Sequence, residues 1–182
     1  MKKVYWRPRG ISRTLLALLT LVSTAGLVAV EKLQTRTEQR YYEDKLEAAR
    51  LAQDALGVLR GERIQKEPPL DLITDPAESG LIGLAMSPVT SDPGSLPAKQ
   101  TSVNPNFAAV VVEWLRDAGV QKDDVVAVGV SGSFPAINVC VYAALQALEL
   151  KPVIISSAAA SQWGANLPDF LWLHMERILN QY

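Results

Sequence analysis

The sequence has few of the side chains that build disulfides and metal sites. Cysteine and histidine occur once each in 182 residues, as Cys140 and His174. A single cysteine excludes an intramolecular disulfide, and one cysteine with one histidine does not make a metal-ligand set. Cys140 lies in a strongly apolar stretch, which is typical of a packed, inert thiol. We therefore expect no metal site, and no cofactor is indicated.

A surplus of positive charge is also missing. The formal net charge is −1 at pH 7, which argues against nucleic-acid binding because phosphate contacts need an excess of Lys and Arg. The charge is unevenly distributed, however, because basic residues precede the first acidic residue, Glu31. These basic residues are Lys2, Lys3, Arg7, Arg9 and Arg13. Positive charge is retained on the cytoplasmic side of a membrane, so we expect residues 1–13 to be cytoplasmic.

An uncharged apolar run follows, from Thr14 to Val30. A helix of this length spans about 25 Å, close to the ~30 Å hydrocarbon core of a bilayer. Residues 14–30 therefore predict one transmembrane helix that acts as a signal anchor. A cleaved signal peptide is the alternative, because Ser23 and Ala25 have the small-residue spacing of a cleavage site. The apolar run continues beyond that site, which favours the anchor, and in both cases the rest of the chain is extracytoplasmic.

Two segments of different composition come next. Residues 31–66 are charged and rich in alanine, with apolar residues at steps of three and four: Tyr42, Leu46, Ala49, Ala52, Leu56 and Leu59. This spacing predicts a helical stalk, which either binds a partner or packs on its own domain. Residues 67–104 are rich in proline and glycine and predict turns, with one short buried strand at Leu81–Met86.

Residues 105–182 alternate between helical and strand patterns. Asn104 and Pro105 predict a helix start and Gly119 its end. The buried face of this helix is expected to hold Phe107, Val110, Val111, Trp114 and Leu115. The segment Asp124–Val130, which is rich in valine and has no polar alternation after Asp124, predicts a strand covered on both faces. A helix from Pro135 to about Leu150, a strand at Val153–Ser157 and a helix from about Leu167 to the end complete the pattern.

This β-α-β order predicts the α/β fold class. We expect a small parallel-sheet domain of Rossmann-like, three-layer form, preceded by the transmembrane helix and the stalk. Ligands of such sheets bind at the carboxyl ends of the strands. The candidate ligand-binding residues at these ends are Ser131, Gly132, Ser133, Ser156, Ser157, Trp163 and Asn166. A helix N-terminus favours negative charge, so the predicted ligand is a carboxylate or phosphate; a tight turn without any ligand remains the alternative.

A serine hydrolase is a competing interpretation of the same turn. Residues 129–133 read Gly-Val-Ser-Gly-Ser, close to the G-x-S-x-G nucleophile elbow, with Ser131 as the candidate nucleophile. His174 is the one histidine that could serve as its base, and Asp169 is poorly spaced to orient it. The turn also lacks the Gly-Lys-Ser/Thr of a phosphate-binding loop. The incomplete triad leaves enzymatic activity uncertain and favours a binding module.

Several blocks together resemble the poly-gamma-glutamate system protein family. These blocks are DPAESGLIG, NPNFAAVVVEWLRDAGV, GVSGSFPAIN, KPVIISSAAASQWGAN and LPDFLWLHMERIL, and they span roughly Asp75 to Asn180. Gln162 stands where the resemblance implies a small residue. The resemblance implies a role beside the machinery that makes and exports poly-γ-glutamate, and it implies no catalytic residues. Members continue beyond this point, so it also implies a shortened chain with an incomplete 105–182 domain.

These observations lead to one expected function with two alternatives. We expect a membrane-anchored accessory protein of poly-γ-glutamate synthesis or export that binds an anionic ligand at residues 131–133. The ligand would be the polymer or another anionic small molecule, and the synthase complex and the membrane would be the partners. The first alternative is a hydrolase of γ-glutamyl or ester bonds that uses Ser131. The second is a structural scaffold that recruits the synthase complex through the stalk.

Overall fold

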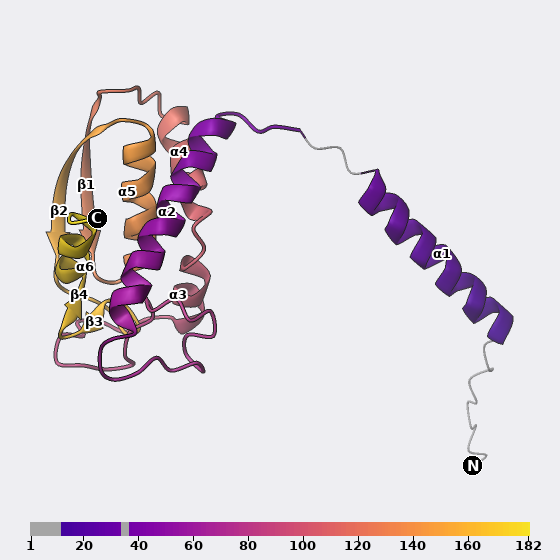
Figure 1. Cartoon of the computed structure of the whole chain (residues 1–182), viewed down its shortest axis with the longest axis horizontal. Helices are drawn as coiled ribbons and strands as arrows, with labels where there is room; N and C mark the ends of the chain where they lie inside the picture. The colour runs from indigo at the N-terminus through magenta and orange to yellow at the C-terminus, as the bar shows by residue number, and fades with distance from the viewer. Residues whose placement is uncertain (1–11, 34–36) are drawn as a thin grey trace, which may run out of the picture. The chain divides into compact units, whose positions relative to one another are not determined.

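The computed structural model describes residues 12–33 and 37–182, which contain six helices and two sheets of two strands each. The chain divides into two units, Met1–Glu38 and Gln39–Tyr182. Most of the predicted basic segment 1–13 lies outside the described residues. The fold is mixed α/β, as the sequence predicts, with its sheets and five of the helices in the second unit (Figure 1).

Helix α1 (Arg13–Lys32) occupies the predicted apolar run and buries none of its side chains. Its Ser12 cap accepts a hydrogen bond from the Leu15 N–H at 3.4 Å. In the part of the chain that is described, α1 is the one helix long and apolar enough to cross a membrane. A signal sequence near the N-terminus satisfies the same criterion equally well, so the helix itself is confirmed while its role as anchor stays a prediction.

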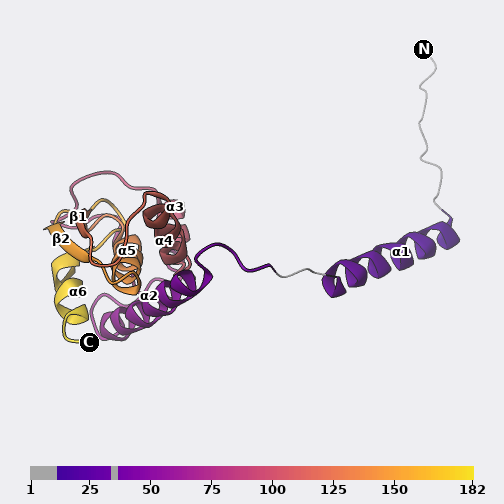
Figure 2. The ribbon, with the colours of Figure 1, turned by 90° about the horizontal axis from the view of Figure 1, so that it is seen from above.

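Helix α2 (Tyr42–Arg63) belongs to the second unit and is not an independent stalk. It packs against α4 (Phe107–Asp117) and α5 (Pro135–Ala147), and the three helices lie together in both views of the ribbon (Figures 1 and 2). The helix predicted over residues 31–66 therefore packs on its own domain, which is one of the two alternatives. It is shorter than predicted, since it covers Tyr42–Arg63. Ala52 and Leu59 of the predicted apolar stripe are fully buried.

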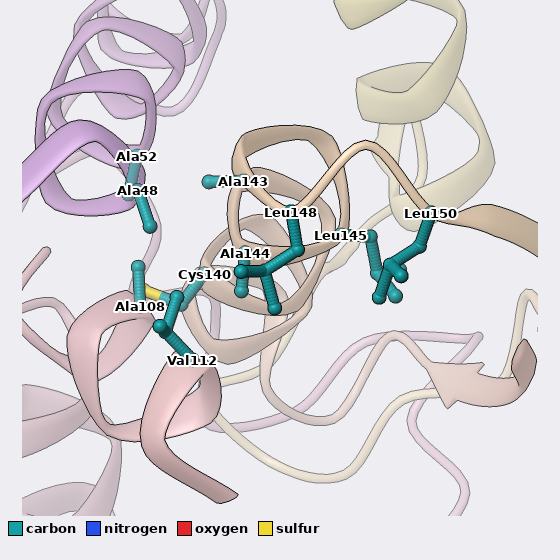
Figure 3. Close-up of a cluster of buried hydrophobic side chains, with 10 residues drawn as sticks. All are labelled: Ala48, Ala52, Ala108, Val112, Cys140, Ala143, Ala144, Leu145, Leu148 and Leu150. Atoms are coloured by element: carbon teal, nitrogen blue, oxygen red, sulfur yellow. The ribbon is translucent and has the colours of Figure 1, made fainter. Parts of the chain in front are cut away.

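The core between these helices is built mainly from small side chains, which point toward one another in Figure 3. Ala48 and Ala52 of α2 meet Ala108 and Val112 of α4, with Ala144 of α5 beside them, and all five are 0% exposed. Small side chains at the contact allow the helix axes to approach closely. Close packing around alanines therefore decides which face of each helix is buried.

This packing corrects the predicted buried face of α4. Trp114 is 68% exposed and Val110 is 36% exposed, whereas Ala108 and Val112 are completely buried. The segment FAAVVVEWL offers two overlapping apolar stripes, and the one with the smaller side chains faces α2 and α5. Gly119 ends the helix region with φ +85°, as predicted for a left-handed terminator.

Strands β1 (Val125–Ser131) and β2 (Lys151–Ser157) pair in parallel, with Val125 opposite Lys151 and Ser131 opposite Ser157. This confirms the predicted β-α-β unit. The prediction that β1 is covered on both faces is wrong, however. Val126 and Val128 face the core, whereas Val125 is 69% exposed. On the same outer face Ile155 of β2 is 76% exposed, so helices cover only one side of this sheet within residues 37–182.

The remaining elements differ from the sequence-based boundaries. Helix α3 (Leu96–Ser102) lies in the segment predicted as turns. Leu81 and Ile82 are buried, as expected of the predicted 81–86 strand, but no strand forms there in the described chain. The final helix α6 (Trp172–Leu179) begins later than predicted, because a short hairpin of β3 (Asn166–Leu167) and β4 (Phe170–Leu171) precedes it.

Cys140 lies among the side chains of the α2–α4–α5 core (Figure 3) and is completely buried. Burial raises the pKa of its thiol from 9.0 to about 11, although a hydrogen bond from the Ala108 backbone opposes the shift. The unfolded chain therefore loses this proton at lower pH than the folded chain does. By linkage, the stability that the protonated thiol contributes is fully present below pH 9 and is lost as the pH rises toward about 11.

We expect Cys140→Ala to flatten the alkaline pH dependence of stability. The wild-type free energy of unfolding should fall by about 2 kcal/mol more than that of the variant between the two pKa values. Urea denaturation of the full-length chain in detergent, followed by tryptophan fluorescence across this pH range, measures the difference. Tyr142, whose pKa is raised to about 12, adds the same alkaline slope to both proteins. Parallel pH profiles for the two proteins would contradict the assignment to Cys140.

Candidate functional site

The predicted site begins where β1 ends. The N–H of Gly132 donates to the Ala159 carbonyl at 2.9 Å, and the N–H of Ala165 donates to the Gly132 carbonyl at 2.6 Å. A Cβ at Gly132 would lie 3.0 Å from the Cβ of Ala160. A side chain here would therefore push on the loop after β2, residues 159–165, which packs directly on the turn.

The two serines of the turn are held by local hydrogen bonds. The hydroxyl of Ser131 accepts from the Ser133 N–H at 3.4 Å, and its carbonyl accepts from Asn138 Nδ2 at 2.8 Å. The hydroxyl of Ser133 accepts from the Ser161 N–H at 3.1 Å. The structure thus brings Ser131, Gly132 and Ser133 together as one ordered turn, as the sequence predicts.

A buried lysine lies behind this turn, and sequence reasoning missed it. Lys99, from α3, is 2% exposed. Its Nζ donates to Ser161 Oγ at 2.8 Å and to the Ser133 carbonyl, and it lies 3.6 Å from the centre of the Phe134 ring. Within the described chain no carboxylate forms an ion pair with Lys99. Burial lowers the pKa of this ammonium, as expected for a charge removed from water without a counter-charge.

No signal in the sequence marks Lys99. It stands in a Pro- and Gly-rich segment of 67–104, far along the chain from the serines it contacts, and nothing distinguishes it there from the other lysines. Lysine is almost never fully buried unless paired. Its position beside the turn is therefore the feature of the site that only the tertiary structure reveals.

The first turn of α5 adds positive potential to the same edge of the sheet. Phe134 caps the helix without a side-chain hydrogen bond, and Pro135 carries no N–H. The first backbone bond into the helix runs from the Asn138 N–H to the Phe134 carbonyl at 3.1 Å. Among the described residues, none accepts a hydrogen bond from the N–H groups of Ala136 or Ile137. Such free donors and the helix dipole favour an anion.

The other predicted ligand-binding residues are distributed differently. Ser157 lies opposite Ser131 at the exposed end of β2, and its hydroxyl accepts from the Ala159 N–H at 3.2 Å. Ser156 points to the opposite face of the strand, where its hydroxyl donates to Glu176 Oε1 at 2.5 Å. The structure therefore keeps Ser157 near the turn and separates Ser156 from it.

Trp163 and Asn166 connect the loop to the segment before α3. The Trp163 N–H donates to the Leu84 carbonyl at 2.9 Å, and its carbonyl accepts from the Gly83 N–H at 3.2 Å. Asn166 is fully buried, and its amide bonds to the Leu84 backbone and to Thr90. Both residues hold the loop in place, and the hydrogen bonds of Asn166 are used within the protein.

The geometry does not assemble a Ser-His-Asp triad. His174 Nδ1 accepts from the Leu171 N–H at 3.1 Å, which fixes the start of α6. Within residues 37–182 no hydrogen bond joins His174 to Ser131, and Asp169 is exposed with no hydrogen bond to His174. No three His, Cys, Asp or Glu side chains of the described chain lie close enough to share a metal ion.

Comparison with known proteins gives no further assignment: no protein-family model, curated protein or solved structure matches this chain. The interpretation of the site consequently depends on its own residues and on the sequence blocks described above.

Proposed function

We propose that this chain is a membrane-anchored accessory protein of poly-γ-glutamate synthesis or export. Its α/β unit binds a carboxylate-bearing ligand at the turn Ser131–Ser133. The observation that carries the proposal is the ammonium of Lys99, which is 2% exposed behind this turn and has no carboxylate partner in the described chain. A buried cation without a counter-charge makes its surroundings favourable for an anion.

Two sources of positive charge lie near the Ser131–Ser133 turn. Lys99 supplies a full positive charge, and the N-terminus of α5 supplies a partial one through its free N–H groups. Both interactions gain strength because the effective dielectric constant near a buried group is lower than that of water. The repeating carboxylates of poly-γ-glutamate match this arrangement, since successive residues of the polymer can rebind the same site.

In this proposal the chain is anchored in the membrane and its sheet is covered on both faces. Helix α1 would be a single-pass anchor with a cytoplasmic N-terminus, which the basic residues at 1–13 favour. The second unit would then be extracytoplasmic, where the synthase complex releases its polymer. In a Rossmann-like, three-layer domain a further layer would cover the outer face of the β1–β2 sheet, which carries exposed apolar residues such as Ile155.

The experiment is a titration of the full-length chain, in nanodiscs of zwitterionic lipid, with γ-glutamyl oligomers. We expect saturable binding that weakens about tenfold or more in Lys99→Met, because a charge-assisted contact is lost. Oligomers with amidated carboxylates should not bind. In Lys99→Met the Ser133 carbonyl and the Ser161 hydroxyl lose a hydrogen-bond donor, which could affect folding. Circular dichroism checks that the variant is folded.

Lys122→Met is the matched control. Lys122 is an exposed lysine that pairs with Glu149 at 2.6 Å and lies outside the turn, so its removal changes the net charge equally without touching the site. Its binding curve should overlay that of the wild type. Equal weakening by both variants, or an absence of saturable binding by the wild type, would overturn the proposed ligand.

The two alternative functions have less support. A hydrolase would need a base for Ser131, and the hydrogen bond of His174 to the Leu171 N–H leaves that role unfilled. A scaffold that recruits the synthase through the 31–66 helix would need an exposed apolar stripe, whereas Ala48, Ala52 and Leu59 are buried in the second unit. A binding function at the turn is therefore the proposal that we carry forward.

A further inference from the structure

A cleft lies on the helix-covered side of the sheet, away from the Ser131 turn. Its volume is about 700 Å³, within the range of about 300–1,000 Å³ that is typical of small-molecule sites. Helices α2, α5 and α6 and strand β2 all contribute side chains to its wall. These four elements belong to the same unit, and α6 lies beside β2 in both ribbon views (Figures 1 and 2).

Three polar side chains converge in this cleft. Tyr142 and Ser156 both donate hydrogen bonds to the same oxygen, Oε1, of Glu176, and the Ser156 distance is 2.5 Å. Burial, reinforced by the Glu176 carboxylate, raises the pKa of Tyr142 to about 12, so the phenol remains a donor at neutral pH. The ring of Tyr142 is itself fixed by edge-to-face contact with the buried Trp172 at 5.6 Å.

This network orients Glu176 and leaves half of its carboxylate available. Its second oxygen, Oε2, has no hydrogen-bond partner among the described residues, and Glu176 forms no ion pair with them. Glu176 is half-buried, so its carboxylate is partly removed from water and gains from a cationic partner. A carboxylate held by two hydroxyl groups and facing a cleft therefore resembles a preorganised acceptor for a cationic group.

Other residues that line the cleft also suit a cationic ligand. Asp54 of α2, an exposed residue, places a second carboxylate on the wall, and no ion pair or hydrogen bond engages it within residues 37–182. None of the described residues that line the cleft is Lys, Arg or His. Leu51, Val139 and Ile154 add apolar surface to the same wall. Negative charge combined with an aliphatic wall selects an organic cation with an aliphatic body.

We infer that this cleft is a binding site for an aliphatic ammonium ligand, with Glu176 as the main ammonium acceptor and Asp54 as a second one. The two carboxylates, which come from different helices, favour a diammonium chain over a single amine. Tyr142 and Ser156 act as positioning residues for Glu176. The inference does not depend on the proposed function, because it concerns different residues and a ligand of opposite charge.

The test is calorimetric titration of the full-length chain, in nanodiscs of zwitterionic lipid, with α,ω-diaminopentane. We expect saturable binding with a Kd of about 1 mM or tighter. Glu176→Gln should weaken it about tenfold. Gln retains an acceptor oxygen for Tyr142 and Ser156, so this variant should keep the wild-type fold, which circular dichroism checks. Asp54→Asn should weaken the diamine more than it weakens pentylamine, because only the diamine carries a second ammonium group for Asp54.

Two matched controls complete the test. Asp169→Asn removes an exposed carboxylate that does not line the cleft, and its affinity should equal that of the wild type. Pentanediol has the length of the diamine without its charge and should not bind. Absence of saturable diamine binding, equal affinity in Glu176→Gln, or equal binding of the diol would each overturn the inference. Loss of γ-glutamyl binding at Lys99 would leave it unaffected.

Discussion

Replacing Gly83 by alanine is expected to destabilise the second unit by about 3 kcal/mol or more. A Cβ at Gly83 would lie 1.9 Å from the Gly164 carbonyl oxygen and 2.2 Å from Asn166 Oδ1. The first atom belongs to the backbone and the second to a fully buried side chain, so neither can move without breaking hydrogen bonds. Since domains of this size are stable by only about 5–15 kcal/mol, the loss should be easily measured.

Urea denaturation of the full-length chain in detergent, followed by tryptophan fluorescence, measures this change. Gly57→Ala is the matched control, because a Cβ at this exposed position of α2 meets nothing within 4 Å. There we expect stabilisation by about 0.5–1 kcal/mol, since alanine is the better helix former. If Gly83→Ala unfolded at the wild-type midpoint, the close approach of residues 83 and 164 would be absent in solution.

Removal of the Asn166 amide is expected to cost about 3 kcal/mol. Asn166 is 0% exposed, and Oδ1 accepts from the Leu84 N–H at 2.8 Å. Its Nδ2 donates to the Leu84 carbonyl at 2.8 Å and to Thr90 Oγ1 at 2.9 Å. Asn166→Ala removes all three bonds and leaves the Leu84 N–H without a partner, while the Leu84 carbonyl keeps its hydrogen bond from the Trp163 N–H. The unsatisfied N–H and the three lost hydrogen bonds together account for the expected loss.

Thermal and urea denaturation of Asn166→Ala should show the loss, and Asn106→Ala serves as its control. Asn106 precedes α4, is exposed and makes no side-chain capping bond, so its replacement should change stability by less than about 0.5 kcal/mol. Because Asn166 holds the loop that packs on Gly132, its loss should also weaken γ-glutamyl binding. Equal stability of the two variants would mean that the Asn166 hydrogen bonds contribute no net stabilisation.

Local patterns were sufficient for the elements that depend on nearby residues. The uncharged run before Glu31 predicts α1 because a long apolar helix needs no tertiary contact to be recognised. The sequence from Val125 to Ser157 predicts two parallel strands around a helix, because β-branched runs and Pro135 specify these elements locally. The turn Ser131–Ser133 follows from the same pattern, and the structure confirms the position of all these elements.

Prediction failed where distant segments compete for the same surface. The sequence predicts Trp114 in the core, but the face of α4 that carries Ala108 and Val112 is the buried one, and Trp114 is 68% exposed. The last helix was expected from Leu167, yet hydrogen bonds of Asn166 to Leu84 fix a hairpin at that point. The outer face of β1 was expected to be covered, and within residues 37–182 no element packs there. The apolar composition of a strand does not by itself show whether other elements cover one of its faces or both.

The same distinction between local and long-range contacts applies to the two candidate sites. The sequence by itself determined the Ser131–Ser133 turn, because strand, glycine and helix start are consecutive and their geometry is local. Only the tertiary structure brought Lys99 to that turn, and only it gathered Tyr142, Ser156 and Glu176 around one carboxylate oxygen. Contacts between residues far apart in the chain depend on how helices pack, and packing is decided by the shapes of side chains that no local pattern records.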